Sequence, residues 1–160
     1  MKFHHLIEIN DPLNPLIEPL SRSQLWQGLV LRAEAPQMFI PWLDSCTLVE
    51  RSPTTLSREL RYGTLVVRDT VTFVPEQRVE YDIPEQKDIP QSRLVMTIEE
   101  PQPEIFFVRF EYDDAAGESE TDEQAYFNDF RRSAYEEADI DTIRIIRQLA
   151  EEGRFDSPPM

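Results

Sequence analysis

The chain has 160 residues, 40% of them hydrophobic, with 31 acidic against 16 basic residues and a formal net charge of −15. This length predicts one domain that can bury roughly 70% of its unfolded surface. The acidic charge argues against nucleic acids and anionic membranes as partners, because both require a basic surface. We ascribe the charge to solubility; the alternative is an acidic docking face for a basic partner.

Cys46 is the single cysteine, so no intrachain disulfide can form and a reducing compartment is expected. Residues 1–10 lack the basic and apolar segments of a signal peptide. No apolar run approaches the roughly 20 residues of a membrane span. We therefore expect a cytoplasmic protein without membrane insertion.

The first third of the chain predicts a strand and two helices. Alternation over residues 3–10 is typical of a half-buried strand, with His5 on the same face as the apolar side chains. The three prolines of residues 11–20 indicate a loop. A capping-box sequence that begins at Ser21 opens a helix, which Pro36 ends. A short second helix over residues 37–43 is expected next.

Within the first of these helices, Leu25, Leu29 and Arg32 fall on one side. After the helices, period-two alternation continues to about Tyr112 and predicts six more strands, separated by proline and glycine. These strands cover residues 46–51, 56–62, 65–74, 78–83, 93–100 and 105–112.

Three hairpin turns are expected at residues 63–64, 75–77 and 101–103, and each fixes a register. All the predicted pairs share one face of the sheet: Tyr62 with Leu65, Leu60 with Val67, Arg58 with Asp69, Leu56 with Val71, Phe73 with Val79, Val71 with Tyr81, Ile98 with Phe106, Met96 with Val108, and Leu94 with Phe110. On the opposite face, Arg93 is expected beside Glu111. The shared face is apolar except for Arg58 and Asp69.

Residues 121–153 predict one helix of roughly 30 residues and about 45 Å. Thr121 can cap its start, and Gly153 lies where helices commonly end. Its expected buried stripe consists of Phe127, Phe130, Ala134, Ala138, Thr142, Ile145 and Leu149, widened by Tyr126, Ile140, Ile143, Ile146 and Ala150. Such a stripe needs a broad cover, which the apolar face of the sheet provides.

This order of elements, together with residues 39–46, 57–63, 71–73 and 81–84, resembles the AtaL-like subfamily of the START and birch-pollen-allergen superfamily (SRPBCC). The superfamily includes polyketide cyclases and aromatases, whereas the function of this subfamily is largely unassigned. The resemblance covers nearly the whole chain and implies an α+β helix-grip fold. In that fold, a seven-stranded curved antiparallel sheet wraps around a long C-terminal helix, with two short helices between the first two strands.

The resemblance also implies an apolar pocket between sheet and helix, entered near the two-helix corner. The glycine-rich loop of the plant allergens is absent, because residues 52–55 occupy its place, and no catalytic residue of the superfamily has a recognisable counterpart. We expect residues 1–155 to form one helix-grip domain and residues 156–160 a disordered tail.

The residues agree with a pocket in part. Large side chains begin the long helix and small ones, Ala134 and Ala138, follow midway, which would leave space opposite the sheet. The alternative is a tightly packed core without a void. The candidate ligand-binding residues are Arg58, Leu60, Val67, Asp69, Val71, Phe73, Tyr81, Met96, Phe106, Val108, Phe110, Phe127, Phe130, Ala134 and Ala138.

Arg58 and Asp69 are the weak catalytic candidates. If both face the apolar side, Arg58 can clamp a carboxylate, enolate or phenolate while Asp69 holds it or acts as a base. The alternative is that a bulge leaves both at an exposed rim. His4 and His5 point to opposite faces, so no metal site is expected, and Cys46 is read as a buried thiol.

Three functions remain open. The first is binding of a small hydrophobic or aromatic molecule, such as a lipid or polyketide, by a monomer or homodimer without a cofactor. The second is an enzyme of the cyclase, aromatase or dehydratase kind that uses Arg58 and Asp69. The third is a protein-interaction module that engages partners through the acidic segment 113–123, which is otherwise read as a solvated loop.

Overall fold

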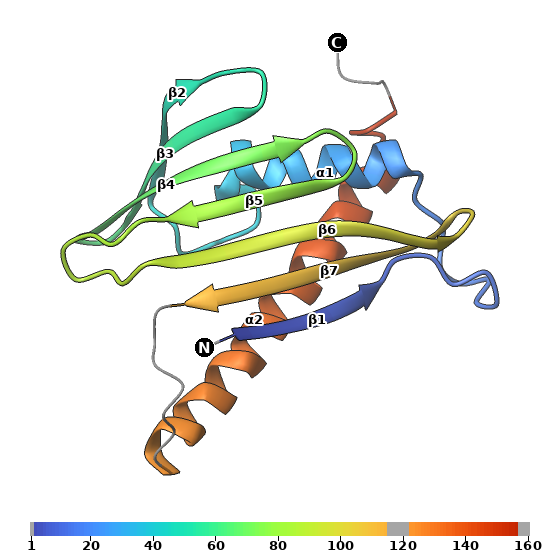
Figure 1. Ribbon diagram of the computed structural model, residues 1–160. Coiled ribbons are helices and arrows are strands. Elements are labelled where there is room, and N and C mark those ends of the chain that lie inside the picture. Colours follow the sequence, from blue (N-terminus) through green and yellow to red (C-terminus); the bar gives the residue numbers. More distant parts are fainter. Residues whose placement is uncertain (1, 115–121, 157–160) are drawn as a thin grey trace.

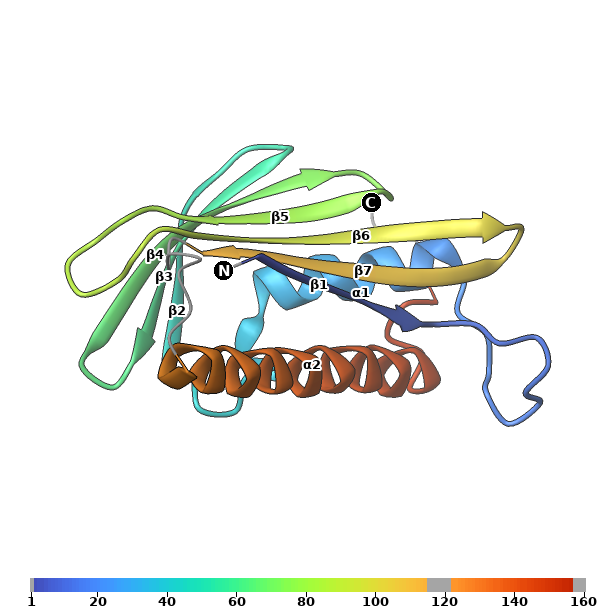
Figure 2. The same cartoon turned by 60° about the horizontal axis from the view of Figure 1, so that its bottom comes forward.

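The computed structural model describes residues 2–114 and 122–156, with side chains of the last helix from Ala125 onward. Seven antiparallel strands form one sheet in the order β1-β7-β6-β5-β4-β3-β2 (Figure 1). The strands are β1 (Lys2–Glu8), β2 (Ser45–Arg51), β3 (Thr55–Tyr62), β4 (Leu65–Val74), β5 (Arg78–Ile83), β6 (Ser92–Gln102) and β7 (Ile105–Asp114). The helices are α1 (Arg22–Glu34), the 3-10 helix η1 (Pro36–Met38) and α2 (Asp122–Glu151). Both α-helices lie on the same side of the curved sheet (Figure 2).

The capping box of α1 is confirmed. The amide of Gln24 donates to the hydroxyl of Ser21 at 3.1 Å, and the amide of Ser21 donates to the side chain of Gln24 at 2.9 Å. The helix expected over residues 37–43 is wrong, because only the short 3-10 helix Pro36–Met38 forms there. Pro41 explains the early stop, since it has no amide hydrogen with which to continue a helical ladder.

The registers of the first two predicted hairpins are confirmed. Arg58 lies opposite Asp69, and Val71 lies opposite Tyr81. These turns are short, so turn chemistry alone fixed which residues pair.

The third register is wrong by two residues. Ile98 lies opposite Val108 rather than Phe106, and Arg93 lies opposite Asp113 rather than Glu111. Met96 likewise pairs with Phe110 and Leu94 with Tyr112. The strands run on to an irregularity between Glu99 and Gln102, which moves the turn toward Glu104. A slip of two keeps each side chain on its expected face, because strand side chains alternate with period two.

The core lies between the inner face of the sheet, α1 and the C-terminal half of α2. Its fully buried members include Leu25, Leu29, Met96, Phe110 and Ile146. The two helices approach each other closely at Gly28, because a Cβ atom built there would lie 2.5 Å from Cγ2 of Ile146. The two helices therefore pack in direct contact at this end of the molecule.

The buried stripe predicted for α2 is correct only toward its C-terminus. Phe127 and Phe130 are 54% and 67% exposed, and Ala134 and Ala138 are also exposed. The buried positions are Asn128, Asp139, Thr142, Ile143, Ile146 and Leu149. The first turns of α2 extend past β1, the edge strand, so they have no apolar sheet face to cover (Figure 1).

The ends of α2 bear on further expectations. Gly153 has the positive φ, 79°, that its position after the helix predicts. The proposed cap at Thr121 and the tail at residues 157–160 lie outside the described residues. The acidic segment 113–123 is not one loop, because its first two residues end β7 and its last two begin α2, and residues 115–121 between them lie outside the description.

Candidate functional site

A cleft of about 420 Å³ opens between the inner face of β3 to β6 and the facing sides of α1, η1 and α2. This volume is typical of small-molecule sites. Its apolar lining includes Ile40, Leu60, Val67, Ile83, Ile89 and Leu94. The polar groups include Arg32, Arg58, Tyr62, Asp69, Tyr81, Arg131 and Tyr135.

The structure divides the predicted ligand-binding residues into three groups. Five of them line the cleft: Arg58, Leu60, Val67, Asp69 and Tyr81. Six belong to the packed core: Val71, Phe73, Met96, Phe106, Val108 and Phe110. The remaining four, Phe127, Phe130, Ala134 and Ala138, are exposed on α2, so the expectation that they face the pocket is wrong. The interior is thus tightly packed at one end and open at the other.

Arg58 and Asp69 form a buried ion pair. They are 4% and 6% exposed, so the alternative of an exposed rim is wrong. The Nε and Nη2 atoms of Arg58 donate to the two carboxylate oxygens of Asp69 at 2.9 and 2.5 Å. Burial lowers the pKa of Arg58, but its hydrogen bonds and attraction to Asp69 raise that pKa by more. Because both Asp69 oxygens are engaged by one guanidinium, Asp69 has little freedom to act as a base.

Arg58 also fixes α1 to the sheet. Its Nη1 atom donates to the carbonyl oxygen of Ala33 at 2.9 Å. Ala33 lies in the last turn of α1, where carbonyl oxygens have no partner within the helix. The pair therefore joins β3, β4 and the end of α1, and this junction forms one end of the cleft.

Tyr81 and Arg32 lie beside that pair. Tyr81 is 3% exposed, and the guanidinium carbons of Arg32 and Arg58 lie 5.3 and 5.1 Å from the centre of its ring. Among the described residues, the Tyr81 hydroxyl is a buried side-chain oxygen with no hydrogen-bond partner. Burial lowers the pKa of Arg32, but Tyr81, Tyr112 and Asp139 together raise that pKa by more.

A second polar cluster surrounds Asp139 on the inner face of α2. Its carboxylate accepts hydrogen bonds from the Tyr112 hydroxyl at 2.7 and 2.8 Å and lies 2.7 Å from Nε2 of His5. Burial raises the pKa of Asp139, whereas the hydrogen bonds from His5 and Tyr112 lower it by less. Burial and the neighbouring Asp139 raise the pKa of Tyr112. Tyr112 stacks on Tyr135, with ring centres 4.0 Å apart, and thereby connects this cluster to the cleft.

Asp139, Tyr135 and Arg131 were not predicted as site residues from the sequence, whereas the hydroxyl of Tyr112 was considered for a pocket together with those of Tyr62 and Tyr81. Hydrophobicity favours the most apolar stripe of α2, whereas the stripe that faces inward lies one residue further along the chain. The signal that was available is spacing: Asp139 precedes Thr142, Ile143 and Ile146 by three, four and seven residues, so all four share a helix face. His5 was correctly assigned to the inner face of β1.

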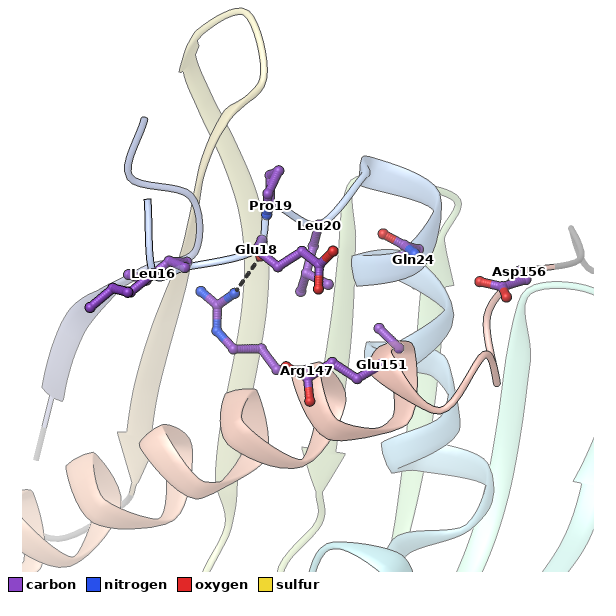
Figure 3. A pocket seen from close by; sticks show the side chains of 10 residues that line it. Leu16, Glu18, Pro19, Leu20, Gln24, Arg147, Glu151 and Asp156 are labelled. Carbon is purple, nitrogen blue, oxygen red and sulfur yellow. Dashed lines mark hydrogen bonds between the residues drawn. The ribbon is translucent and has the colours of Figure 1, made fainter. Parts of the chain in front are cut away.

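A different hollow, of about 360 Å³, lies between the 11–20 loop and the C-terminal end of α2 (Figure 3). Arg147 crosses it and donates to the carbonyl oxygen of Glu18 at 3.3 Å and to that of Ile9. Burial lowers the pKa of Arg147. Three acidic residues, Glu18, Glu151 and Asp156, line this hollow. It therefore suits a polar contact that holds the 11–20 loop to α2 better than it suits an apolar ligand.

Other site chemistry finds little support in the described part of the chain. No group of three or more His, Cys, Asp or Glu side chains there is placed to hold a metal ion. Cys46, expected to be buried, is half-buried, and burial raises the pKa of its thiol. No helix among the described residues is long and apolar enough to cross a membrane.

Comparison with known proteins adds the family. Residues 7–153 match the family described as AtaL, acetylaranotin biosynthesis cluster protein L. No curated protein matches the chain.

Three of the similar solved structures align with nearly the whole of this chain. The di-domain ARO/CYC StfQ from the steffimycin biosynthetic pathway has a TM-score of 0.69 at 15% identity; the alignment covers 96% of this chain, which spans about half (52%) of StfQ. The Zhui aromatase/cyclase from Streptomyces sp. R1128 has a TM-score of 0.62 at 11% identity, covering 94% of this chain and 93% of Zhui. Ara h 8.0201 has a TM-score of 0.59 at 13% identity, covering 95% of this chain and 98% of Ara h 8.0201.

Identities this low establish a shared fold and no more. The sheet that curves over a long C-terminal helix is the helix-grip fold of these proteins. The family match covers most of the sequence. The chain therefore belongs to the AtaL family of helix-grip proteins.

Proposed function

We propose that this chain binds a small hydrophobic or aromatic molecule in the cleft between β3 to β6 and the helices. The observation that carries the proposal is the lining, which combines apolar side chains with a few convergent polar groups. One of these groups, the Tyr81 hydroxyl, is buried and has no hydrogen-bond partner among the described residues. Ligand sites are typically built this way, with apolar area for affinity and a few polar groups for orientation. The similarity to aromatase/cyclases such as Zhui supports a ligand with aromatic or polyketide character.

We infer that Arg58 and Asp69 have a structural role in this site and do not react with the bound ligand. Removing a proton from a ligand would require Asp69 to exchange a bidentate contact with Arg58 for a contact with the ligand. Breaking a buried ion pair in this way is costly. Binding is therefore favoured over turnover through this pair.

The test is native mass spectrometry of freshly purified protein, followed by incubation with methyl 2-naphthoate as a neutral aromatic probe. Val67→Trp should fill the cleft, because Val67 lines it and is half-buried. Ala138→Trp is the matched control, because Ala138 is exposed on α2. We expect the wild type and Ala138→Trp to retain a co-purified molecule or take up the probe, and Val67→Trp to do neither.

Both variants should keep a melting temperature close to that of the wild type. The proposal would be wrong if the wild type neither carried nor took up any molecule, or if Val67→Trp bound the probe as well as the wild type does.

A further inference from the structure

Most of the charged side chains that line the cleft form ion pairs. Arg32 is the exception within the cleft. Arg58 pairs with Asp69, and Arg131 pairs with Asp114. Asp88 lies on the exposed 84–90 loop. Within the described residues, Arg32 forms no ion pair; its Nε atom makes one long hydrogen bond, 3.4 Å, to Thr142. The cleft thus contains a cation without an anionic partner.

Asp139 does not fill that role. It lies near enough to raise the pKa of Arg32, yet its oxygens accept hydrogen bonds from Tyr112 and contact His5. A guanidinium group inside a protein is normally paired with an anion, because an unpaired buried charge carries a large desolvation penalty. An anion from outside the chain could therefore serve as the ion-pair partner of Arg32.

Tyr81 supplies a second observation at the same place. Its hydroxyl is buried and has no acceptor among the described residues, although buried polar atoms are nearly always hydrogen-bonded. Tyr81 and Arg32 both line the cleft, and the Arg32 guanidinium lies over the Tyr81 ring. A hydroxyl and a guanidinium thus lie next to each other in the cleft, and neither contacts an anionic group of the described residues.

Resting on the proposed function, we propose that the ligand carries an oxyanion, such as a carboxylate, which accepts hydrogen bonds from the Arg32 guanidinium and the Tyr81 hydroxyl. Charge-assisted hydrogen bonds of this kind are the strong ones in proteins. The apolar body of the ligand then lies along Ile40, Leu60, Val67 and Leu94. Arg58 is not the clamp, because three of its donors are already used by Asp69 and Ala33.

The experiment compares 2-naphthoate with its neutral methyl ester by isothermal titration calorimetry. The wild type should bind 2-naphthoate at least tenfold more tightly than methyl 2-naphthoate. Arg32→Gln should abolish this preference while leaving the affinity for the ester within about twofold. Tyr81→Phe should weaken 2-naphthoate several-fold and the ester little.

Two further variants guard against misreading a general effect of charge or of unfolding. Arg144→Gln removes an exposed arginine from α2 outside the cleft and should bind both probes as the wild type does. Arg32→Lys keeps the cation and should retain part of the preference for the acid.

The outcomes separate this inference from the function on which it rests. Equal affinity of the wild type for acid and ester, or an equal loss of both in Arg32→Gln, would overturn the oxyanion site and leave the cleft as a neutral ligand site. Failure of the wild type to bind either probe would contradict the proposed function as well.

Discussion

The two halves of α2 meet the rest of the molecule in different ways. The C-terminal half presents Ile143, Ile146 and Leu149 to the core and packs against α1 at Gly28. The N-terminal half turns Asn128 and Tyr135 inward, followed by Asp139 just past the middle of the helix, and leaves Phe127 and Phe130 exposed. One half is thus held by apolar burial and the other by polar contacts around a cleft. The comparison teaches that one uninterrupted helix can close a core and border a binding site.

The largest expected effect concerns the ion pair at the end of the cleft. Arg58→Met should lower the free energy of unfolding by about 3–5 kcal/mol, because it leaves Asp69 buried without a partner. The double variant Arg58→Met/Asp69→Leu should recover much of that loss, since no unpaired charge remains. Urea denaturation measures both. A double variant as unstable as the single one would show that the contact to Ala33, rather than the lone carboxylate, dominates.

The packed half of α2 should be nearly as sensitive. Ile146→Ala removes a fully buried side chain and should cost about 2–5 kcal/mol in the same assay. Phe130→Ala, in the exposed half, should change stability by no more than about 0.5 kcal/mol. Similar losses in the two variants would mean that the N-terminal half of α2 is as deeply packed as the C-terminal half, contrary to this structure.

The contact between the two helices gives a smaller effect. Gly28→Ala places a methyl group against Ile146 and should destabilise the protein by about 1–3 kcal/mol. Shortening the neighbour in Gly28→Ala/Ile146→Val should recover part of this cost, and a double-mutant cycle measures the coupling. If the two substitutions were simply additive, the helices would not be in contact at this point.

The polar contacts around Asp139 predict that the stability of the protein depends on pH. Burial raises the pKa of Asp139 in the folded protein, so the folded chain holds this proton to a higher pH than the unfolded chain does. The stability that this protonation contributes is present below the unfolded pKa, about 3.9, and is lost as the pH rises through the folded pKa. The free energy of unfolding of the wild type, relative to Asp139→Asn, should therefore fall as the pH rises through that window.

Chemical denaturation over a series of pH values measures this difference. A difference that grew with pH would mean that the hydrogen bonds from His5 and Tyr112 outweigh burial and hold Asp139 ionised.

Most of the fold could be predicted from the sequence, because its local signals agree with one another. Alternation located the strands, and the short turn at Gly63 fixed the pairing of Arg58 with Asp69. The β6–β7 register was missed because the strands continue through Pro101 to a later turn. Because the segment between β6 and β7 contains two prolines, the sequence alone does not show at which residue the hydrogen-bonded pairing of the two strands ends.

The candidate site could be predicted only in part. Arg58, Leu60, Val67, Asp69 and Tyr81 were found because they follow from strand register. Tyr135 and Asp139 were not, because the orientation of α2 depends on where the helix passes the edge of the sheet. Arg32 was placed on the same side of α1 as Leu25 and Leu29, but that placement alone did not mark it as a site residue. Hydrophobicity assigned its aromatic residues to the interior, whereas the path of the helix leaves Phe127 and Phe130 outside.

The most direct test of the account is a methyl NMR titration of the isotope-labelled protein with methyl 2-naphthoate. The account predicts chemical-shift changes at the methyl groups of Ile40, Leu60, Val67 and Leu94, which line the cleft, and little change at Val108 and Ile146, which lie in the core. Changes centred on the core methyl groups, or no changes at saturating probe, would contradict the claim that this molecule is packed at one end and open to a ligand at the other.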